Sequence, residues 1–168
     1  MPDTSAIHDA YLRGDLDGLK ALLGDPPDFP NCPGPADVGP NVLEYAIYWS
    51  PFSFIRALLD LGADPNYDDP AGFPSLIAAL STERADKPAI LRLLLSHGAD
   101  VQQRGVNDFT PLHYAASLDE PEAIAILLDG GADPSTRTRI DEYETALELA
   151  ERANNQGAVH ALKMGRAP

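Results

Sequence analysis

The sequence predicts an all-α solenoid of stacked helix-turn-helix units with projecting loops, and three recurrences support this. Adjacent leucines recur at positions 22–23, 58–59, 94–95 and 127–128. The tripeptide Gly-Ala-Asp recurs at positions 62–64, 98–100 and 131–133. The positions equivalent to Thr110 are Ser5, Asn41, Pro74 and Thr145, at intervals of 36, 33, 36 and 35 residues. Units of this kind bury their apolar stripes against one another, so they are expected to form one continuous core.

The clearest unit is residues 107–135, which encode two short amphipathic helices. The i, i+3, i+4 spacing of a helix occurs twice, at Leu112, Ala115 and Ala116 and at Ile124, Leu127 and Leu128. Thr110 is expected to cap the first helix, with Pro111 in its first turn, and Pro121 marks the start of the second. Gly131 is expected to end that helix in the left-handed conformation.

The T-P-L-H-x-A pattern from Thr110 to Ala115, followed by a leucine pair and Gly-Ala-Asp, resembles the ankyrin repeat. The resemblance implies an ankyrin-repeat solenoid in a single domain over residues 1–168. The expected repeats are 4–23 as an N-terminal cap, 41–67, 74–103, 110–136 and 145–163 as a C-terminal cap. Residues 24–40 contain six prolines and three glycines. They are expected to form an inserted irregular loop, either a tolerated surface insertion or a partner-contacting loop.

The remaining units keep parts of the pattern. The first retains Ile7, His8 and Ala10, and its acidic and polar residues suit an exposed end of the stack. In the second, Asn41 is expected to cap the first helix, and Ser50 with Pro51 to open the second.

The third and fifth units depart further from the reference. In the third, the cap is expected to shift to Ser75, and the turn from Thr82 to Pro88 is expected to be three residues longer than its counterpart. In the fifth, Asn154, Asn155 and Gln156 suit an exposed C-terminal cap.

The chain is strongly acidic, with a formal net charge of −14 and a pI near 4.4. This charge disfavours binding to nucleic acids and anionic membranes. It favours fast encounter with a basic partner, or simply keeps the protein dispersed. Cys32 is the only cysteine, so no intrachain disulfide is expected, which suits a reducing compartment. The N-terminus does not resemble a secretory signal and no apolar stretch is long enough to span a membrane, so we expect a cytoplasmic location.

The histidines and recurring aspartates are expected to be structural. His113 holds the fourth place of T-P-L-H, where the resemblance implies hydrogen bonds that tie adjacent loops together. His97 lies beside Gly98, where it can satisfy terminal carbonyls of a helix. The four histidines show no metal-binding spacing, and the Gly-Ala-Asp aspartates recur as turn residues. No cofactor is expected, and enzyme activity is the least favoured function.

The resemblance also implies a concave partner-binding face made of loop tips and the ends of the first helices. Carried over by repeat position, the candidate residues are Tyr48, Trp49, Phe73, Ser81, Asn107, Phe109, Leu118, Glu142 and Arg152. Trp49 is the expected anchor, because tryptophan and tyrosine dominate interface hot spots. The alternative is that it packs beneath the proline-rich loop, with Phe73 and Phe109 covering the neighbouring repeats. Arg104, Arg137 and Arg139 are expected to form a positive edge, which either selects an acidic group or is solvated.

The expected function is binding of a folded protein partner, acting by occupancy as an adaptor, regulator or inhibitor. One alternative is an immunity-type inhibitor that neutralises a basic enzyme, and another is a self-associating structural protein. A protein that binds a folded partner in this way is expected to be a monomer when free. Its partner is expected to be a protein, with a basic one favoured by the charge.

Overall fold

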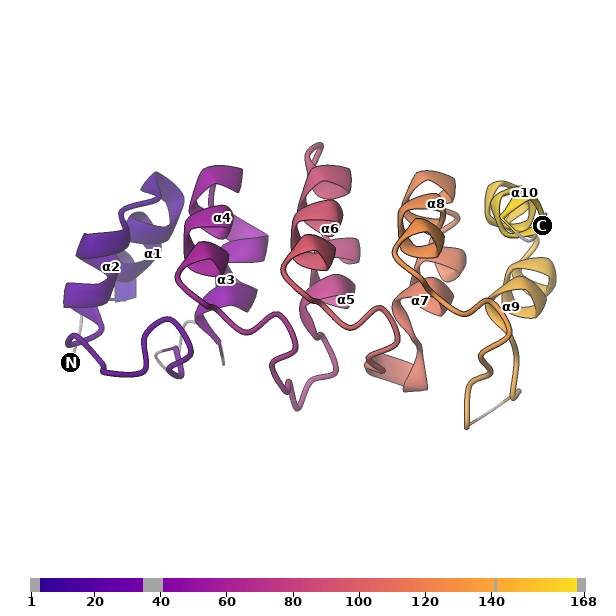
Figure 1. Ribbon diagram of the computed structural model, residues 1–168, viewed down its shortest axis with the longest axis horizontal. Helices are drawn as coiled ribbons and strands as arrows, with labels where there is room; N and C mark the ends of the chain where they lie inside the picture. Colours follow the sequence, from indigo (N-terminus) through magenta and orange to yellow (C-terminus); the bar gives the residue numbers. More distant parts are fainter. Residues whose placement is uncertain (1–3, 35–40, 141, 166–168) are drawn as a thin grey trace.

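Paired helices stand side by side in one row, and the segments that connect successive pairs project from one edge of it (Figure 1). The computed structural model describes residues 4–34, 41–140 and 142–165. The α-helices in these residues are α1 Thr4–Arg13, α2 Leu16–Leu22, α3 Val42–Trp49, α4 Phe52–Asp60, α5 Ser75–Leu80, α6 Lys87–Ser96, α7 Pro111–Ser117, α8 Pro121–Asp129, α9 Ala146–Ala153 and α10 Gln156–Met164. No strand occurs in this part of the chain, and the one isolated bridge joins Arg137 and Thr145. The predicted all-α solenoid is therefore confirmed.

Side-chain caps fix the start of several first helices. The Thr110 hydroxyl accepts a hydrogen bond from the His113 amide at the start of α7, and the Asn41 side chain accepts one from the Leu43 amide at the start of α3. Both caps were predicted. Such a cap satisfies an amide that has no partner within the helix, and its loss costs about 1 kcal/mol.

Two predicted helix starts are wrong by one residue. Helix α5 begins at Ser75 itself, with Pro74 as the cap residue, and α4 begins at Phe52, with Pro51 as the cap residue. In both cases an extended proline, with ψ near 160° or 150°, occupies the position before the helix. Ser50 instead ends α3, where its amide bonds to the Ala46 carbonyl. The buried Ser75 hydroxyl has no hydrogen-bond partner among the described residues.

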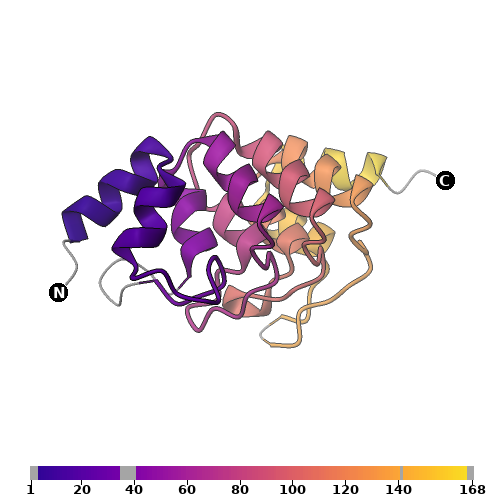
Figure 2. The same cartoon turned by 60° about the vertical axis from the view of Figure 1, so that its left-hand side comes forward.

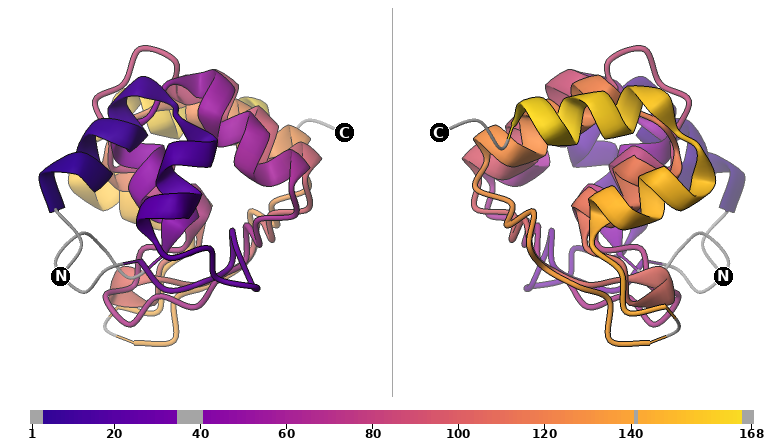
Figure 3. Two further views of the ribbon diagram at one scale, coloured as in Figure 1. Left: turned by 90° about the vertical axis from the view of Figure 1, so that its left-hand side faces the viewer. Right: turned by 90° about the vertical axis from the view of Figure 1, so that its right-hand side faces the viewer.

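All helices from α3 onward, and α1, pack on a counterpart in a neighbouring pair. The first helices α1, α3, α5, α7 and α9 contact one another in succession, as do the second helices from α4 to α10. The two views along the row show these two stacks, with the connecting segments extending away from them (Figure 3). Fully buried side chains such as Tyr11, Ile55, Leu91 and Leu127 form one core through the whole row. The turned view follows that row from the first pair to the last (Figure 2).

The Gly-Ala-Asp turns are structural, as predicted. Gly62, Gly98 and Gly131 all have positive φ, between 87° and 92°, at the end of a second helix. The aspartate that follows accepts a hydrogen bond from the amide two residues further on, as Asp64 does from Asn66 at 2.8 Å. Asp100 and Asp133 make the same bond. These aspartates therefore shape the chain as it leaves each helix pair.

Asparagine bridges link successive connecting segments. The Asn31 amide group donates to the Gly62 carbonyl at 2.9 Å, and its oxygen accepts from the Asp64 amide at 2.7 Å. Asn66 makes the same two bonds to Gly98 and Asp100. The proline-rich segment is thus tied to the second pair through Asn31, although residues 35–40 of that segment lie outside the described residues.

A second set of links lies at the opposite edge of the row, where the two helices of a pair are joined. The turn of the third pair, residues 81–86, is three residues longer than residues 118–120 of the fourth, as predicted. Within it, the Arg84 guanidinium donates to the Ser50 carbonyl at 2.7 Å, beyond the end of α3. The amide group of Asn155 likewise donates to the Ala116 carbonyl of α7 at 2.8 Å. Each donor satisfies terminal carbonyls of the preceding first helix.

Candidate partner-binding surface

Trp49, the last residue of α3, is half exposed and is held on one side by the first pair. Its exposed fraction is 52%, and its ring centroid lies 5.7 Å from that of His8 and 6.3 Å from that of Tyr45. His8 Nδ1 and the Tyr45 hydroxyl are hydrogen-bonded at 2.7 Å. These contacts pack one side of the indole against His8 of α1 and Tyr45 of α3 and leave the rest of it exposed to solvent.

Tyr48 and Ser81 connect the second and third pairs at the same level of the row. The Ser81 hydroxyl donates to the Ala78 carbonyl at 2.8 Å, so the Tyr48 hydroxyl is the donor in its 3.0 Å bond to Ser81. Burial raises the pKa of Tyr48 above its ordinary value, and Tyr48 therefore stays neutral at physiological pH. Leu118 occupies the place of Trp49 in the fourth pair and is 45% exposed.

The connecting segments that enter the third, fourth and fifth pairs, counted from the glycine that follows each second helix, are called here the third finger (62–74), the fourth finger (98–110) and the fifth finger (131–140 and 142–145). The third and fourth fingers touch where the Val106 amide donates to the Gly72 carbonyl at 2.8 Å. A Cβ on Gly105 would lie 2.3 Å from that same carbonyl oxygen. Glycine at 105 is therefore required for the fingers to approach this closely.

A pocket of about 210 Å³ lies between the fourth and fifth fingers. Its lining residues are Asn107, Phe109, Thr138, Ile140, Glu142, Glu144 and Arg152. Arg152 reaches it from α9 and forms a two-pronged ion pair with Glu144, with Nε–Oε1 and Nη2–Oε2 distances of 2.6 and 2.8 Å. The pocket brings together four of the predicted binding residues, namely Asn107, Phe109, Glu142 and Arg152.

His113 forms the support beneath this pocket. It is only 1% exposed, its Nδ1 is bonded to the Thr110 hydroxyl at 2.8 Å, and its Nε2 donates to the Glu144 carbonyl at 3.0 Å. Burial lowers the pKa of His113, so the ring stays neutral. Phe109 stacks on it, with ring centroids 5.9 Å apart. His113 ties the fourth pair to the fifth finger, which confirms the structural interpretation of this histidine.

The three arginines expected to form a positive edge are paired within the chain. Arg104 and Arg139 both bind the Asp108 carboxylate, and Arg137 binds Glu148 with distances of 2.7 and 2.8 Å. Hydrogen bonds from Arg139 hold the pKa of Asp108 below its usual range. The charges of the three arginines are therefore paired with carboxylates of the chain itself, and these ion pairs hold the fourth and fifth fingers in place.

The structure divides the predicted binding residues into two groups. Phe73 and Phe109 lie in the fingers, before the first helices begin, whereas Trp49 and Leu118 lie where these helices end. A first helix of eight residues is about 12 Å long, which separates the two groups. Phe73 is half buried against the core, and its carbonyl accepts a bond from the Tyr67 hydroxyl. The sequence interpretation overlooked Thr138 and Ile140, although residues 138, 140, 142 and 144 show the period of two that places side chains on one face of an extended chain.

Metal-binding clusters and bilayer-crossing helices are both absent from residues 4–34, 41–140 and 142–165. No cluster of three or more histidine, cysteine, aspartate or glutamate side chains with a geometry suited to a metal ion occurs there. None of the helices there has the length and apolar character needed to cross a bilayer. Cys32 is buried and free.

Comparison with known proteins identifies the repeats. A family model described as ankyrin repeats (3 copies) matches residues 43–138 and again residues 76–166. The chain is 33% identical over 105 residues to alpha-latrocrustotoxin-Lt1a of Latrodectus tredecimguttatus, an alignment that covers 62% of this chain and 7% of the toxin. It is 33% identical over 152 residues to Protein PhlB of Serratia liquefaciens, covering 90% of this chain and 63% of that protein. It is 27% identical over 164 residues to human Inversin, covering 94% of this chain and 14% of Inversin.

The chain therefore spans only a small part of the toxin and of Inversin, and less than two thirds of Protein PhlB. The matched repeats, however, cover more than half of the chain itself, and they coincide with the helix pairs from α3 to α10. Together, the repeating helix pairs and the match of the family model lead to one conclusion: the chain belongs to the ankyrin-repeat family.

Proposed function

We propose that this chain binds a folded protein partner through the face formed by the fingers and the ends of the first helices. Ankyrin repeats are generally protein–protein interaction modules. The observation that carries the proposal is Trp49, a half-exposed tryptophan packed on one side against His8 and Tyr45. A fixed aromatic side chain loses little conformational entropy when a partner covers it, which is the property of an interface hot spot.

The proposed mode of action is occupancy. The chain would block, scaffold or stabilise its partner without chemistry of its own. The net charge of −14 favours a basic partner and speeds its encounter with the surface. The same charge supports one narrower version of the proposal, an inhibitor that neutralises a basic enzyme. We also propose that the chain acts in the cytoplasm, because a single cysteine, which leaves no intrachain disulfide, suits a reducing compartment.

The test compares two variants that remove apolar side chains of similar exposure. Trp49→Ala removes the anchor, and Leu61→Ala removes a side chain that is 54% exposed but lies outside the proposed surface. Partners would be captured from an extract of the native cells, identified, and their affinities measured with the purified proteins. Trp49→Ala is expected to lower the affinity for the partner by about 25-fold or more, because truncation of a hot spot costs ~2 kcal/mol or more. Leu61→Ala is expected to leave the affinity unchanged.

Equal affinities for wild type and Trp49→Ala, with circular dichroism showing both folded, would rule out Trp49 as the anchor. A defined homo-oligomer in light scattering, without any foreign partner, would favour the self-associating alternative. If turnover of a substrate by the purified chain were detected and were lost on His113→Ala in a folded protein, action by occupancy alone would be refuted.

A further inference from the structure

Hydrogen bonds within the fifth finger support one side of the pocket between the fourth and fifth fingers. The Thr138 amide donates to the Glu144 carbonyl at 2.9 Å, and the Glu144 amide donates to the Thr138 hydroxyl at 3.1 Å. Arg137 closes the finger from outside, with bonds to the Tyr143 carbonyl at 2.8 Å and to Glu148. These bonds hold the two ends of the fifth finger together beside the pocket, and backbone that is already held in place reduces the entropic cost of binding.

The pocket has an apolar wall and an acidic rim. Phe109 and Ile140 supply the apolar wall, and Ile140 is 47% exposed. Two carboxylates, Glu142 and Glu144, and one guanidinium, Arg152, supply the charged groups, so the lining is negative by one unit. Glu142 is exposed and has no hydrogen bond or ion pair with a described residue. Its carboxylate nevertheless contributes, after Glu144, to raising the pKa of Arg152.

The ion pair of Arg152 with Glu144 shows which group these carboxylates accommodate. The guanidinium binds both oxygens of Glu144 in the planar fork geometry that favours arginine over lysine. Glu142 offers a second carboxylate beside it without such a partner. An entering arginine could place its aliphatic stem on Phe109 and Ile140 and its guanidinium at Glu142.

The size of the pocket indicates what it can hold. Its volume of about 210 Å³ lies below the range of roughly 300–1,000 Å³ typical of small-molecule sites. It suits one side chain better than a whole cofactor. The acidic surface of the chain favours approach of a positively charged group.

We propose that the pocket formed by Phe109, Ile140, Glu142 and Glu144 binds the side chain of an arginine presented by a basic protein partner. That the arginine comes from a protein rests on the proposed function, whereas the pocket's affinity for arginine does not. Trp49 and this pocket would then contact the partner at two separate places along the row.

The pocket is tested directly with N-acetyl-arginine amide as the probe and the full chain labelled with ¹⁵N. Saturable shifts of the Asn107, Phe109 and Ile140 amide signals are expected, with a dissociation constant on the order of 1 mM for a ligand of this size. N-acetyl-citrulline amide, which has a similar shape but no charge, is expected to bind at least tenfold more weakly. The comparison is made at constant ionic strength.

Two variants separate this site from general acidity. Glu142→Gln is expected to lower the affinity for the arginine probe about fivefold, because the ion pair that it removes is partly solvated. Glu83→Gln removes an exposed carboxylate in the turn of the third pair and is expected to change nothing. Both positions are exposed, so both variants are expected to keep the circular dichroism spectrum of wild type.

Three results would overturn the proposal. They are the absence of saturable shifts at these amides, equal binding of the citrulline probe, and preferential binding of N-acetyl-aspartate amide, which would assign the pocket to an anion at Arg152 and Arg139. If the probe binds but Trp49→Ala leaves partner affinity intact, the pocket stands while the anchor of the proposed function fails. If the probe does not bind but Trp49→Ala abolishes partner binding, the reverse holds.

Discussion

Glu44 is a carboxylate in the place that a histidine holds in the fourth pair. Counted from the helix cap, Asn41 to Glu44 corresponds to Thr110 to His113. His113 donates a hydrogen bond to the fifth finger, but an ionised carboxylate has no proton to donate. Oε2 of Glu44 is buried without a hydrogen-bond partner among the described residues. Burial, and secondarily the nearby Asp69, raise the pKa of Glu44 from 4.5 to about 7.

The raised pKa predicts a pH-dependent stability. The groups facing Glu44 are Asp69 and Tyr67 of the third finger and Tyr48 of α3. Between pH 4.5 and about 7 the native state keeps a proton on Glu44 that the unfolded chain releases. The stability contributed by protonated Glu44 is therefore fully present below pH 4.5 and is lost as the pH rises through about 7.

Glu44→Gln is accordingly expected to be more stable than wild type at pH 8, by roughly 1–2 kcal/mol after allowance for solvent screening. The difference is expected to shrink at pH 5. Urea unfolding of both proteins at the two pH values measures it, with Glu83→Gln as an exposed control. A difference in the free energy of unfolding that does not change between pH 5 and pH 8 would contradict this account.

Among connecting elements, the asparagine bridges stop at the fourth finger. Gln102 occupies the position of Asn66, because the backbone amide of each bonds to the carboxylate of the preceding Gly-Ala-Asp turn. Its longer side chain bypasses the next turn and donates to the Thr136 hydroxyl at 2.9 Å, and its Oε1 is buried without a partner among the described residues. The bridge that Asn66 makes to the next turn therefore has no counterpart at Gln102.

Gln102→Asn is expected to restore the missing bridge to Gly131 and Asp133. Two backbone bonds replace one side-chain bond and an unsatisfied oxygen, so the free energy of unfolding is expected to rise by about 1 kcal/mol. Asn66→Ala, which removes an existing bridge, is expected to lower it by about the same amount or more. Thermal unfolding of the two variants beside wild type measures both changes. A loss of stability in Gln102→Asn would mean that the Thr136 contact is worth more than the bridge.

The sequence predicts the elements well where a local interaction determines them. Thr110 and Asn41 cap their helices as predicted, because the cap requires only a side-chain oxygen two or three residues before an amide. Ser75 fails as a cap because the conformation of Pro74, which depends on the whole third finger, decides where α5 begins. The length of the turn at residues 81–86 could be predicted, but the role of Arg84 in it could not, since its acceptor lies 34 residues earlier.

The binding surface was predictable only in part, for the same reason. Repeat position identified Asn107, Phe109, Glu142 and Arg152 one by one, yet only the folded fingers show that they share a pocket. The pairing of Arg139 with Asp108 spans 31 residues, so the sequence analysis, which considered only an acidic partner group or solvent for this arginine, did not predict it.

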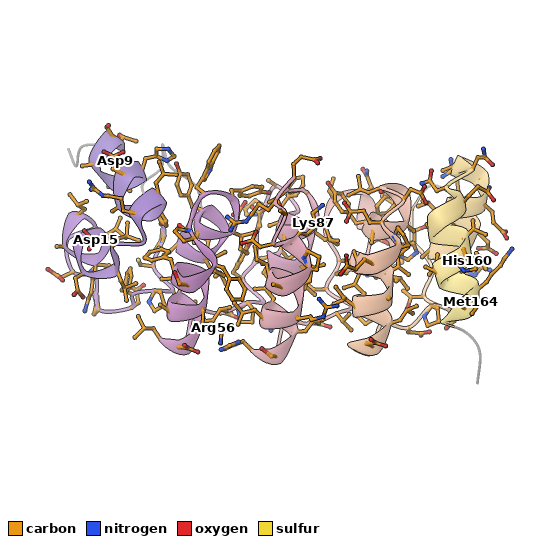
Figure 4. The ribbon with its side chains drawn as sticks, turned by 90° about the horizontal axis from the view of Figure 1, so that it is seen from above. Asp9, Asp15, Arg56, Lys87, His160 and Met164 are labelled. Carbon is orange, nitrogen blue, oxygen red and sulfur yellow. The ribbon has the colours of Figure 1, made fainter. Side chains whose placement is uncertain are left out.

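At the scale of the whole molecule, the main helix–helix contacts of each pair among the described residues are with neighbouring pairs, so the stability of one pair is expected to depend on the pairs beside it. A pair at either end of the row has one neighbouring pair, whereas a pair in the middle has two. Asp9 and Asp15 mark one end, His160 and Met164 the other, and Lys87 lies near the middle (Figure 4). Lys87 joins two pairs there, through a 2.6 Å ion pair with Glu120.

A cavity in the middle of the row is therefore expected to destabilise more helix pairs than a cavity at one end. Leu91→Ala in α6 and Leu162→Ala in α10 each remove a fully buried leucine, at a cost of roughly 2–5 kcal/mol. Leu91→Ala is expected to lower hydrogen-exchange protection from α3 to α8, and Leu162→Ala only in α9 and α10. Exchange measured by mass spectrometry distinguishes them. Equal loss of protection along the whole chain in both variants would indicate a single cooperative unit instead.

The contact of Arg84 with the end of α3 bears on what counts as one module of this protein. The additional residues of the third pair complete a helix that belongs to the second. A third pair transplanted alone into another array would keep the ion pair of Arg84 with Asp86 but lose the carbonyl acceptors at the end of α3, and the second pair left behind would lose that donor. A segment moved to another array therefore has to include both α3 and residue 84, so the second and third pairs are expected to move together as one module.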